Sequence, residues 1–378
     1  MQTAMHTRLN RRALAAKLDA FQVPSVGRSI AQLASTAALY AVGLAAMYYV
    51  GIHLSPWLAL VLTIPTAGFV VRLFIIQHDC GHGSFFRSSR ANQIVGWFCG
   101  LLTFTPYESW RRQHAGHHAI WNNLDKRHGG TDLYSTCLTV EEYQALSPFR
   151  RWFYRLVRHP VVSQLLLPPL LFVVWYRLPF DTPKAWRKER RSVYLTNLGL
   201  VAVLATMVTF LGWKPVLFVQ GPIMVIASIV GVWLFSVQHR FEDSEWFRGG
   251  KWSPAEAALH GCSLLRLPRL LQWFTGNIGF HHVHHMLPRV PNYRLQACHD
   301  AEPIFVNGVT TLTLRQALRA PSFALWDEAR GVMVRFPSWR QSQATFHGSP
   351  SQDRRAPDEA FADFLVNPAS GVAGGHIQ

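Results

Sequence analysis

Residues 216–237, VLFVQGPIMVIASIVGVWLFSV, decide the class of fold, because they contain no charged residue over the length of a membrane span. A helix needs about 20 mostly apolar residues to cross the hydrocarbon core of a bilayer. Three more apolar stretches lie upstream, at 30–50, 57–76 and 193–213. Short connections join the stretches in pairs, so the sequence predicts an all-α integral membrane protein with four transmembrane helices in two hairpins.

The distribution of charge predicts which side of the membrane each segment occupies. The formal net charge of +16 would suit a nucleic-acid partner, but the basic residues gather in the segments between the spans. The tight connections 51–56 and 214–215 carry only Lys214. Basic segments remain in the cytoplasm. We therefore expect a cytosolic basic segment at 1–28, a cytosolic middle and C-terminus, membrane lipids as neighbours and no nucleic-acid partner.

Two further apolar segments are predicted to lie at the interface without crossing. Residues 94–104 are too few to cross at about 1.5 Å per residue. Residues 160–178 contain Pro168 and Pro169, which damage a spanning helix. A crossing there would also place the histidine clusters described next on opposite faces. The membrane domain is thus expected over 29–337, followed by a flexible tail, rich in Ser, Gln, Ala and Gly, at 338–378.

Three histidine clusters follow apolar segments on the predicted cytosolic side, in the motifs HDCGH, HAGHH and HHVHH. On a helix, residues three and four apart share one face, so each motif can direct several imidazoles to one point. We expect these clusters to form a histidine-rich helical cap that holds a di-metal site. The histidines at these spacings are His78, His82, His114, His117, His118, His281, His284 and His285.

The chemistry of this ligand set favours a redox metal. Imidazole suits zinc, copper, iron or nickel, and eight histidines are too many for one ion, so two ions are implied. A hydrolytic zinc site of the HExxH kind would carry a carboxylate base among its ligands, and no such motif is present. The five scattered cysteines form no CxxC pair, which argues against thiolate zinc and disulfides. An iron pair is the better prediction.

The order and context of these motifs resemble the membrane fatty acid desaturase family. HDCGH is followed about thirty residues later by HAGHH, and HHVHH comes after the second hairpin. The surrounding segments HHAIWNNLDKRHGGTDLYSTCLTVEEY, QHRFEDSEW and NIGFHHVHHMLPRVPNYRL are similar to the bacterial Δ12 (omega-6) acyl desaturases. The resemblance covers roughly residues 30 to 320.

The resemblance implies an enzyme that uses two iron ions, O2 and two electrons to introduce a cis double bond into an acyl lipid. The electrons would come from a separate ferredoxin-like donor, because no fused haem domain with an HPGG motif is present. The enzyme would lie in a bacterial inner membrane with its active site facing the cytoplasm. The eight histidines above are the implied ligands, and His282 occupies the variable position of its motif. The segment QHRFED adds His239, which ends the fourth span at the depth of His78.

Several roles stay open in the sequence. The carboxylates Asp79, Asp132 and Glu242 could orient the ligands from behind, or could cap helix ends and pair with arginines. Trp97, Trp110 and Trp121 are predicted to anchor the chain at the interface. The same scaffold could act as a hydroxylase, ketolase or acetylenase. A metal transporter or metal-storing protein is a further alternative, although the histidines lie beyond the span ends rather than at the midplane.

Overall fold

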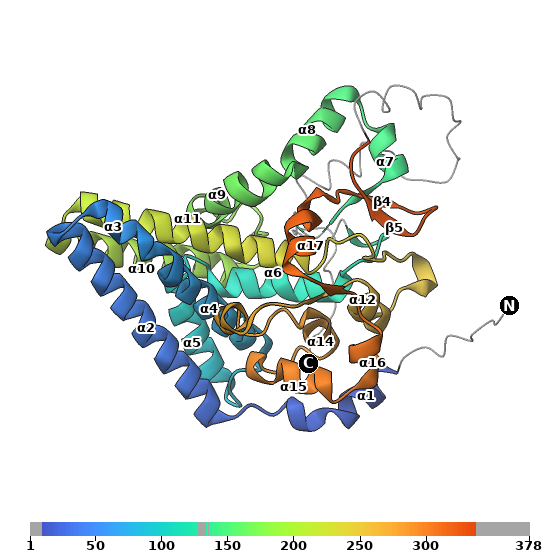
Figure 1. The fold of residues 1–378 in the computed structure, drawn as a ribbon, viewed down its shortest axis with the longest axis horizontal. Helices are drawn as coiled ribbons and strands as arrows, with labels where there is room; N and C mark the ends of the chain where they lie inside the picture. Colours follow the sequence, from blue (N-terminus) through green and yellow to red (C-terminus); the bar gives the residue numbers. More distant parts are fainter. Residues whose placement is uncertain (1–9, 128–133, 135, 338–378) are drawn as a thin grey trace.

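A computed structural model describes residues 10–127, 134 and 136–337. Long helices extend to one side of the molecule, and short helices and strands form a cap at the other (Figure 1). The longer elements are α2 (Val26–His53), α4 (Thr63–His82), α5 (Ser89–Leu102), α6 (Tyr107–Ile120), α8 (Pro148–Arg158), α10 (Arg187–Leu211) and α11 (Trp213–Val237). The shorter helices are α1 (Arg11–Lys17), α3 (Pro56–Val61), α7 (Val140–Ala145), α9 (Leu167–Val173), α12 (Pro254–His260), α13 (Arg269–Phe274), α14 (His281–Met286), α15 (Leu295–Asp300), α16 (Pro303–Asn307) and α17 (Leu314–Arg319).

Two small sheets add short strands to the helical cap. One has the order β1-β4-β5, with β1 (Leu138–Thr139) parallel to β4 (Leu325–Asp327) and β4 antiparallel to β5 (Val332–Val334). In the other, β2 (Leu264–Leu265) pairs in parallel with β3 (Thr311–Leu312). Strands of two or three residues show no periodicity in a sequence. The protein is therefore mostly helical, as predicted, with these pairings as an addition.

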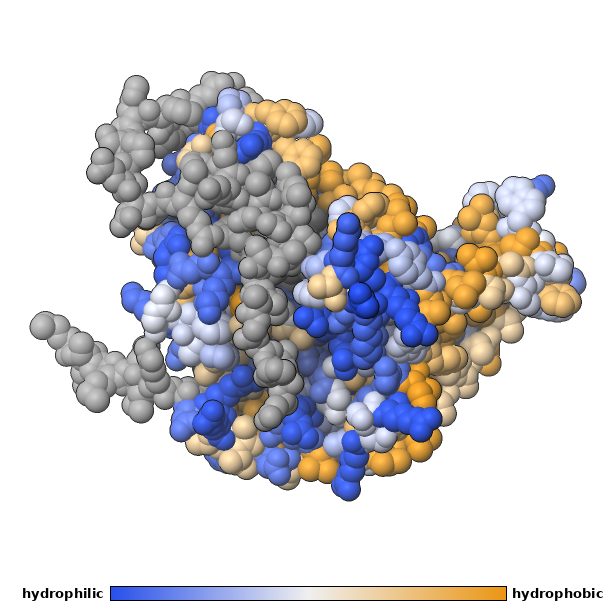
Figure 2. All heavy atoms as spheres, turned by 180° about the vertical axis from the view of Figure 1, so that it is seen from behind, coloured by the Kyte–Doolittle hydropathy of each residue, from blue (hydrophilic) through white to orange (hydrophobic). Residues whose placement is uncertain are grey.

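Among the described residues, three helical stretches are long and apolar enough to cross a membrane. They are Asp19–His53, Arg187–Leu211 and Trp213–Val237, and they contain the predicted first, third and fourth spans. A fourth crossing is possible if the pair Pro148–Arg158 and Val162–Arg177, bent by 55°, forms one broken span. Hydrophobic residues cover the half of the molecule in which these helices extend, and hydrophilic residues gather over the cap (Figure 2).

The predicted second span, residues 57–76, is not one continuous apolar helix. The helix breaks at Leu62, between α3 and α4, and α4 carries the buried Arg72 and a buried polar end at Gln77, His78 and Asp79. Because of these polar residues, α4 is not among the three helical stretches that are apolar enough to cross a membrane. It packs against α2, α5 and α11, and this packing places its histidine end beneath the cap.

The segment 160–178 offers a direct test of the topology. We expect Phe180→Cys to react with a membrane-impermeant thiol reagent only from the cytoplasmic side, because we predict that this segment does not cross. Phe180 is exposed, whereas all five native cysteines are buried and should react slowly. Labelling from the outside alone would show that 160–178 crosses and that the predicted arrangement of spans is wrong.

Candidate metal centre

Four elements bring the predicted histidines to one place beneath the cap. His78 and His82 lie one turn apart at the end of α4, and α6 carries the HAGHH motif in its last two turns. The short helix α14 consists almost entirely of the HHVHH motif, and all its residues are buried. His239 lies two residues beyond the end of α11. Gly83 ends α4 in the left-handed conformation, at φ 67°, which glycine adopts without strain.

The first group of imidazoles unites α4, α6 and α14. The Nε2 atoms of His78 and His284 are 3.0 Å apart, those of His284 and His118 are 2.9 Å apart, and those of His118 and His114 are 3.2 Å apart. Each residue offers a ring nitrogen within 4.8 Å of those of the others. The members are His78, His82, His114, His118 and His284.

The second group lies beside the first and includes the histidine that stands outside the motifs. The Nε2 atom of His117 is 3.1 Å from that of His239 and 3.3 Å from that of His285. His281 joins them, because its Nε2 is 2.9 Å from that of His239. The structure therefore gathers all nine predicted histidines. The α6 and α14 motifs each contribute to both groups.

The nitrogens are spaced as ligands of a shared cation would be. Two imidazole nitrogens at right angles, each about 2.1 Å from an ion, lie about 3.0 Å apart. Hydrogen bonds alone do not account for the contacts, because Nε2 of a neutral imidazole is either one donor or one acceptor. His117 and His239 nevertheless each approach two other Nε2 atoms. Within the described part of the chain, the buried Nε2 atom of half-buried His82 has no hydrogen-bond partner.

Burial keeps these imidazoles in the form that binds metal. Removal from water, and then the neighbouring histidines, lower the pKa of His82, His114 and His118 well below the usual value. The same two causes lower the pKa of His239, His281, His284 and His285. Neutral imidazole has a free lone pair, whereas imidazolium has none. These seven histidines are thus neutral nitrogen donors of the kind that suits a transition metal.

Asp79 is the carboxylate that contacts a predicted ligand. Its Oδ1 is 3.2 Å from Nδ1 of His78, on the side of the ring away from the first group. Its Oδ2 accepts hydrogen bonds from the backbone N and from Nδ2 of Asn292, at 2.7 and 2.8 Å. Gln32 of α2 in turn donates to Asn292 Oδ1 at 2.9 Å. This chain of buried hydrogen bonds fixes the orientation of the His78 ring.

The other two candidate carboxylates have different positions. The Glu242 side chain is exposed, and its backbone oxygen accepts a hydrogen bond from Met333, which ties it to β5. Asp132 lies outside the described residues. On the second group, the neutral thiol of Cys262 lies 3.7 Å from Nδ1 of His239, a contact that the sequence did not indicate.

Two of the predicted interfacial tryptophans are instead part of the site. Trp110 is buried and stacks on His114, with ring centroids 4.7 Å apart and planes 14° apart. Trp121 is buried and lies 3.9 Å from the His239 ring. The prediction that they anchor the chain at the interface is wrong, because α6 turns inward with its histidines. Trp97 of α5 is partly buried against the core of the long helices.

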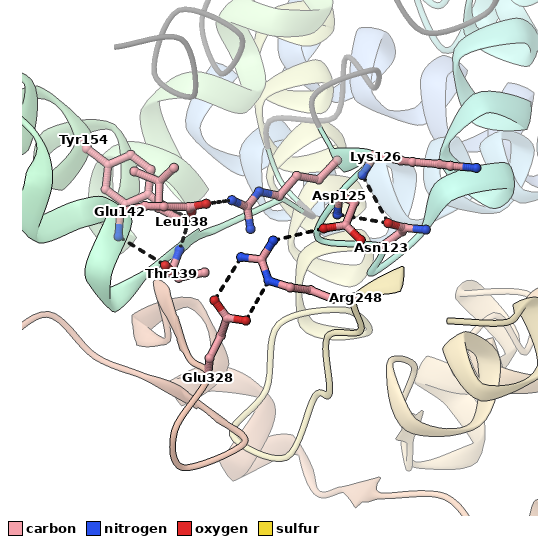
Figure 3. A network of polar contacts seen from close by, with 10 residues as sticks. Asn123, Asp125, Lys126, Leu138, Thr139, Glu142, Tyr154, Arg248 and Glu328 are labelled. Carbon is pink, nitrogen blue, oxygen red and sulfur yellow. Dashed lines mark hydrogen bonds and ion pairs between the residues drawn. The ribbon is translucent and has the colours of Figure 1, made fainter. Parts of the chain in front are cut away.

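A polar network holds the segments that leave the site (Figure 3). Arg248, which follows His239 in the chain, donates to both carboxylate oxygens of Glu328, at 2.7 and 2.9 Å. It also donates to Asp125, just beyond α6, at 3.0 Å. Thr139 and Glu142 cap the start of α7 reciprocally. The network joins the exits of two ligand-bearing segments to the β4–β5 hairpin.

Comparison with known proteins identifies the class of this site. Residues 55–309 match the family model described as fatty acid desaturase. The chain belongs to the fatty acid desaturase family. It is 44% identical over 336 residues to a fatty acid desaturase of Bacillus subtilis (strain 168), covering 89% of this chain and 92% of the relative. The predicted family is confirmed, the protein is an oxidoreductase, and the alternative of a metal transporter or storage protein is set aside.

The names of more distant relatives specify the position of the double bond. An sn-1 oleoyl-lipid 12-desaturase of Synechocystis is 28% identical over 269 residues, covering 70% of this desaturase and 74% of the relative. A temperature-sensitive sn-2 acyl-lipid omega-3 desaturase (ferredoxin) of Arabidopsis thaliana is 30% identical over 261 residues, covering 61% of this chain and 54% of the relative. The relatives thus differ in the position at which they act.

Proposed function

We propose that the protein is a di-iron acyl-lipid desaturase in which the nine clustered histidines hold the two ions. Its active site faces the cytoplasm of a bacterial inner membrane. The observation that carries the proposal is the convergence of neutral imidazoles into two adjacent groups with the spacing of metal ligands. Iron bound there would supply the O2-dependent oxidation that removes two hydrogens from an unactivated alkyl chain. Such chemistry is beyond acid–base side chains.

The residues around the two groups have separate tasks. Asp79 accepts the Nδ1 proton of His78 and so presents Nε2 to the ion. Phe235 lies against the rings of His117 and His239, with centroids 5.1 and 5.3 Å away, and helps to exclude water from that side. Phe74 contacts Trp110, which stacks on His114. An apolar chain can approach such an aromatic wall without being hydrated.

The overall reaction requires a partner that donates electrons. Conversion of a CH2–CH2 unit to CH=CH consumes one O2, two electrons and two protons and releases two waters. We propose a ferredoxin-like protein as the electron donor, which is supported by the Arabidopsis relatives whose names include ferredoxin. We propose Δ12 (omega-6) as the position, which the sequence resemblance and the Synechocystis relative support.

Analysis of fatty acids in an expressing host tests the reaction. We expect a new cis-unsaturated fatty acid, a diene made from an existing monoene, that appears only when O2 is supplied. The His117→Ala variant, expressed at a matched level, is the control and should yield none. A hydroxy or keto product would move the assignment to a hydroxylase or ketolase, and a triple bond to an acetylenase. A double bond at another position would discard only the Δ12 proposal.

The identity of the metal has its own test. Purified protein is expected to contain about two irons per chain, as two imidazole-rich groups predict. Treatment with an iron chelator should abolish turnover, and added ferrous iron should restore it. Elemental analysis of the same preparation provides the measurement. Zinc at one ion per chain, with turnover retained and iron absent, would contradict the di-iron proposal.

A further inference from the structure

A small cavity lies beside the α14 histidine helix but outside both metal-binding groups. Its volume is about 200 Å³. Sites for drug-sized ligands measure about 300–1,000 Å³, so this cavity suits a small polar group. It lies between β2, α13 and α15. The residues that line it are Leu264, Leu265, Arg266, Leu267, Gln272, Thr275, Gly279, Phe280, Gln296, His299 and Asp300.

The cavity carries two opposite charges, both on solvent-exposed side chains. Arg266 and Asp300 are exposed, and in the described part of the chain neither side chain forms a hydrogen bond or ion pair. Burial lowers the pKa of His299, while Asp300 raises it and Arg266 lowers it, so both charges act at this ring. A ligand with one anionic and one cationic group would satisfy both side chains.

Uncharged polar groups complete the lining. Gln272 donates to Oε1 of Gln296 at 2.9 Å, which orients that amide and leaves its NH2 group to donate to a ligand. His299 is buried, and its Nδ1 lies 2.9 Å from Nε2 of His282. This contact accounts for His282, the second histidine of HHVHH, which faces His299 rather than the metal groups. It also joins the wall of the cavity to the helix that carries three of the predicted ligands.

The cavity adjoins a surface that is suited to lipid. Helix α13 supplies Gln272 to the lining, and its neighbours Leu270, Leu271 and Trp273 are 67%, 41% and 37% exposed. The centroid of the Trp273 ring lies 4.1 Å from the guanidinium carbon of Arg72. Arg72 belongs to the predicted span 57–76, so α13 lies against that span. Exposed leucines followed by a tryptophan on a short helix are typical of a segment at the membrane interface.

We propose that this cavity binds the headgroup of a membrane phospholipid that carries a phosphate diester and a primary ammonium. Arg266 and the Gln296 amide donate to phosphate oxygens, and the Asp300 carboxylate accepts from the ammonium. The acyl chains lie over the exposed apolar side chains of α13. The proposed phospholipid shares only its phosphate group with soluble phosphate compounds. Its ammonium group and its acyl chains therefore distinguish it from them.

Binding to the full-length protein as purified in detergent, without O2 or an electron donor, tests this proposal without reference to the reaction. The probes are fluorescent phosphatidylethanolamine, phosphatidylglycerol and diacylglycerol with identical acyl chains. We expect phosphatidylethanolamine to bind most tightly. Arg266→Gln should weaken its binding about tenfold, because the variant loses a charge-assisted hydrogen bond to the phosphate. Asp300→Asn should remove the preference for phosphatidylethanolamine over phosphatidylglycerol.

Arg269→Gln is the matched control, because Arg269 is an exposed arginine of α13 that does not line the cavity. Equal weakening by Arg269→Gln and Arg266→Gln would mean general attraction to the surface and would overturn the proposal. If inorganic phosphate at equal concentration displaced the lipid, the ligand of this cavity would be a soluble phosphate compound, and the proposal of a phospholipid would be wrong. Because binding is measured without turnover, neither result depends on whether the protein is a desaturase.

Discussion

His239→Ala is expected to lose iron and turnover as severely as His117→Ala. His239 lies in contact with two predicted ligands, at 3.1 Å from His117 and 2.9 Å from His281, measured between Nε2 atoms. Its removal leaves the second group without its central imidazole. Loss of a partner behind a ligand alone costs about 10- to 100-fold, so loss of the ligand should reduce turnover by at least about 100-fold.

His159→Ala is the control for this experiment. His159 is exposed at the end of α8 and belongs to neither group, so its variant should keep iron and turnover near the wild-type values. Iron content is measured by elemental analysis and turnover by product formation in the same preparations. Near-normal iron and turnover in His239→Ala would return this residue to a structural role at the end of α11.

Asp79→Asn should have the second largest effect, through the first group. The buried carboxylate contacts Nδ1 of His78 and accepts two hydrogen bonds from Asn292. An amide carries no negative charge and has one acceptor oxygen, so the variant loses at least one of these contacts. Iron affinity, measured by competition with a chelator, is expected to fall about 10- to 100-fold, as for other partners behind a ligand.

Asp125→Asn separates this effect from a general loss of stability. Asp125 also accepts hydrogen bonds from a backbone N–H and an arginine, but it lies in the network of Figure 3 rather than beside a ligand. The thermal midpoint of both metal-free variants should fall, and only Asp79→Asn should lose affinity for iron. Unchanged affinity in Asp79→Asn would make Asp79 a purely structural residue.

The sequence was sufficient to select the histidines that the structure gathers, because each motif is local. Residues three and four apart share one helical face whatever surrounds the helix, so HDCGH, HAGHH and HHVHH could be interpreted without a fold. The apolar stretches that became α2, α10 and α11 were equally clear, since lipid imposes a length and a composition that do not depend on neighbours. His239 followed from the family resemblance of the segment QHRFED together with its depth at the end of a span.

Helix packing decided how the histidines are grouped and which tryptophans are buried, because no local sequence pattern contains this information. The division of the histidines into two groups depends on how α4, α6, α11 and α14 meet, because imidazoles on one helix face can turn to different ions. Trp110 and Trp121 look like interfacial residues in the sequence, yet the inward path of α6 buries them against His114 and His239. The same holds for the break at Leu62 and the contact of His282 with His299. Local periodicity determines which side chains share a face, whereas contacts between distant segments depend on packing that only the tertiary structure contains.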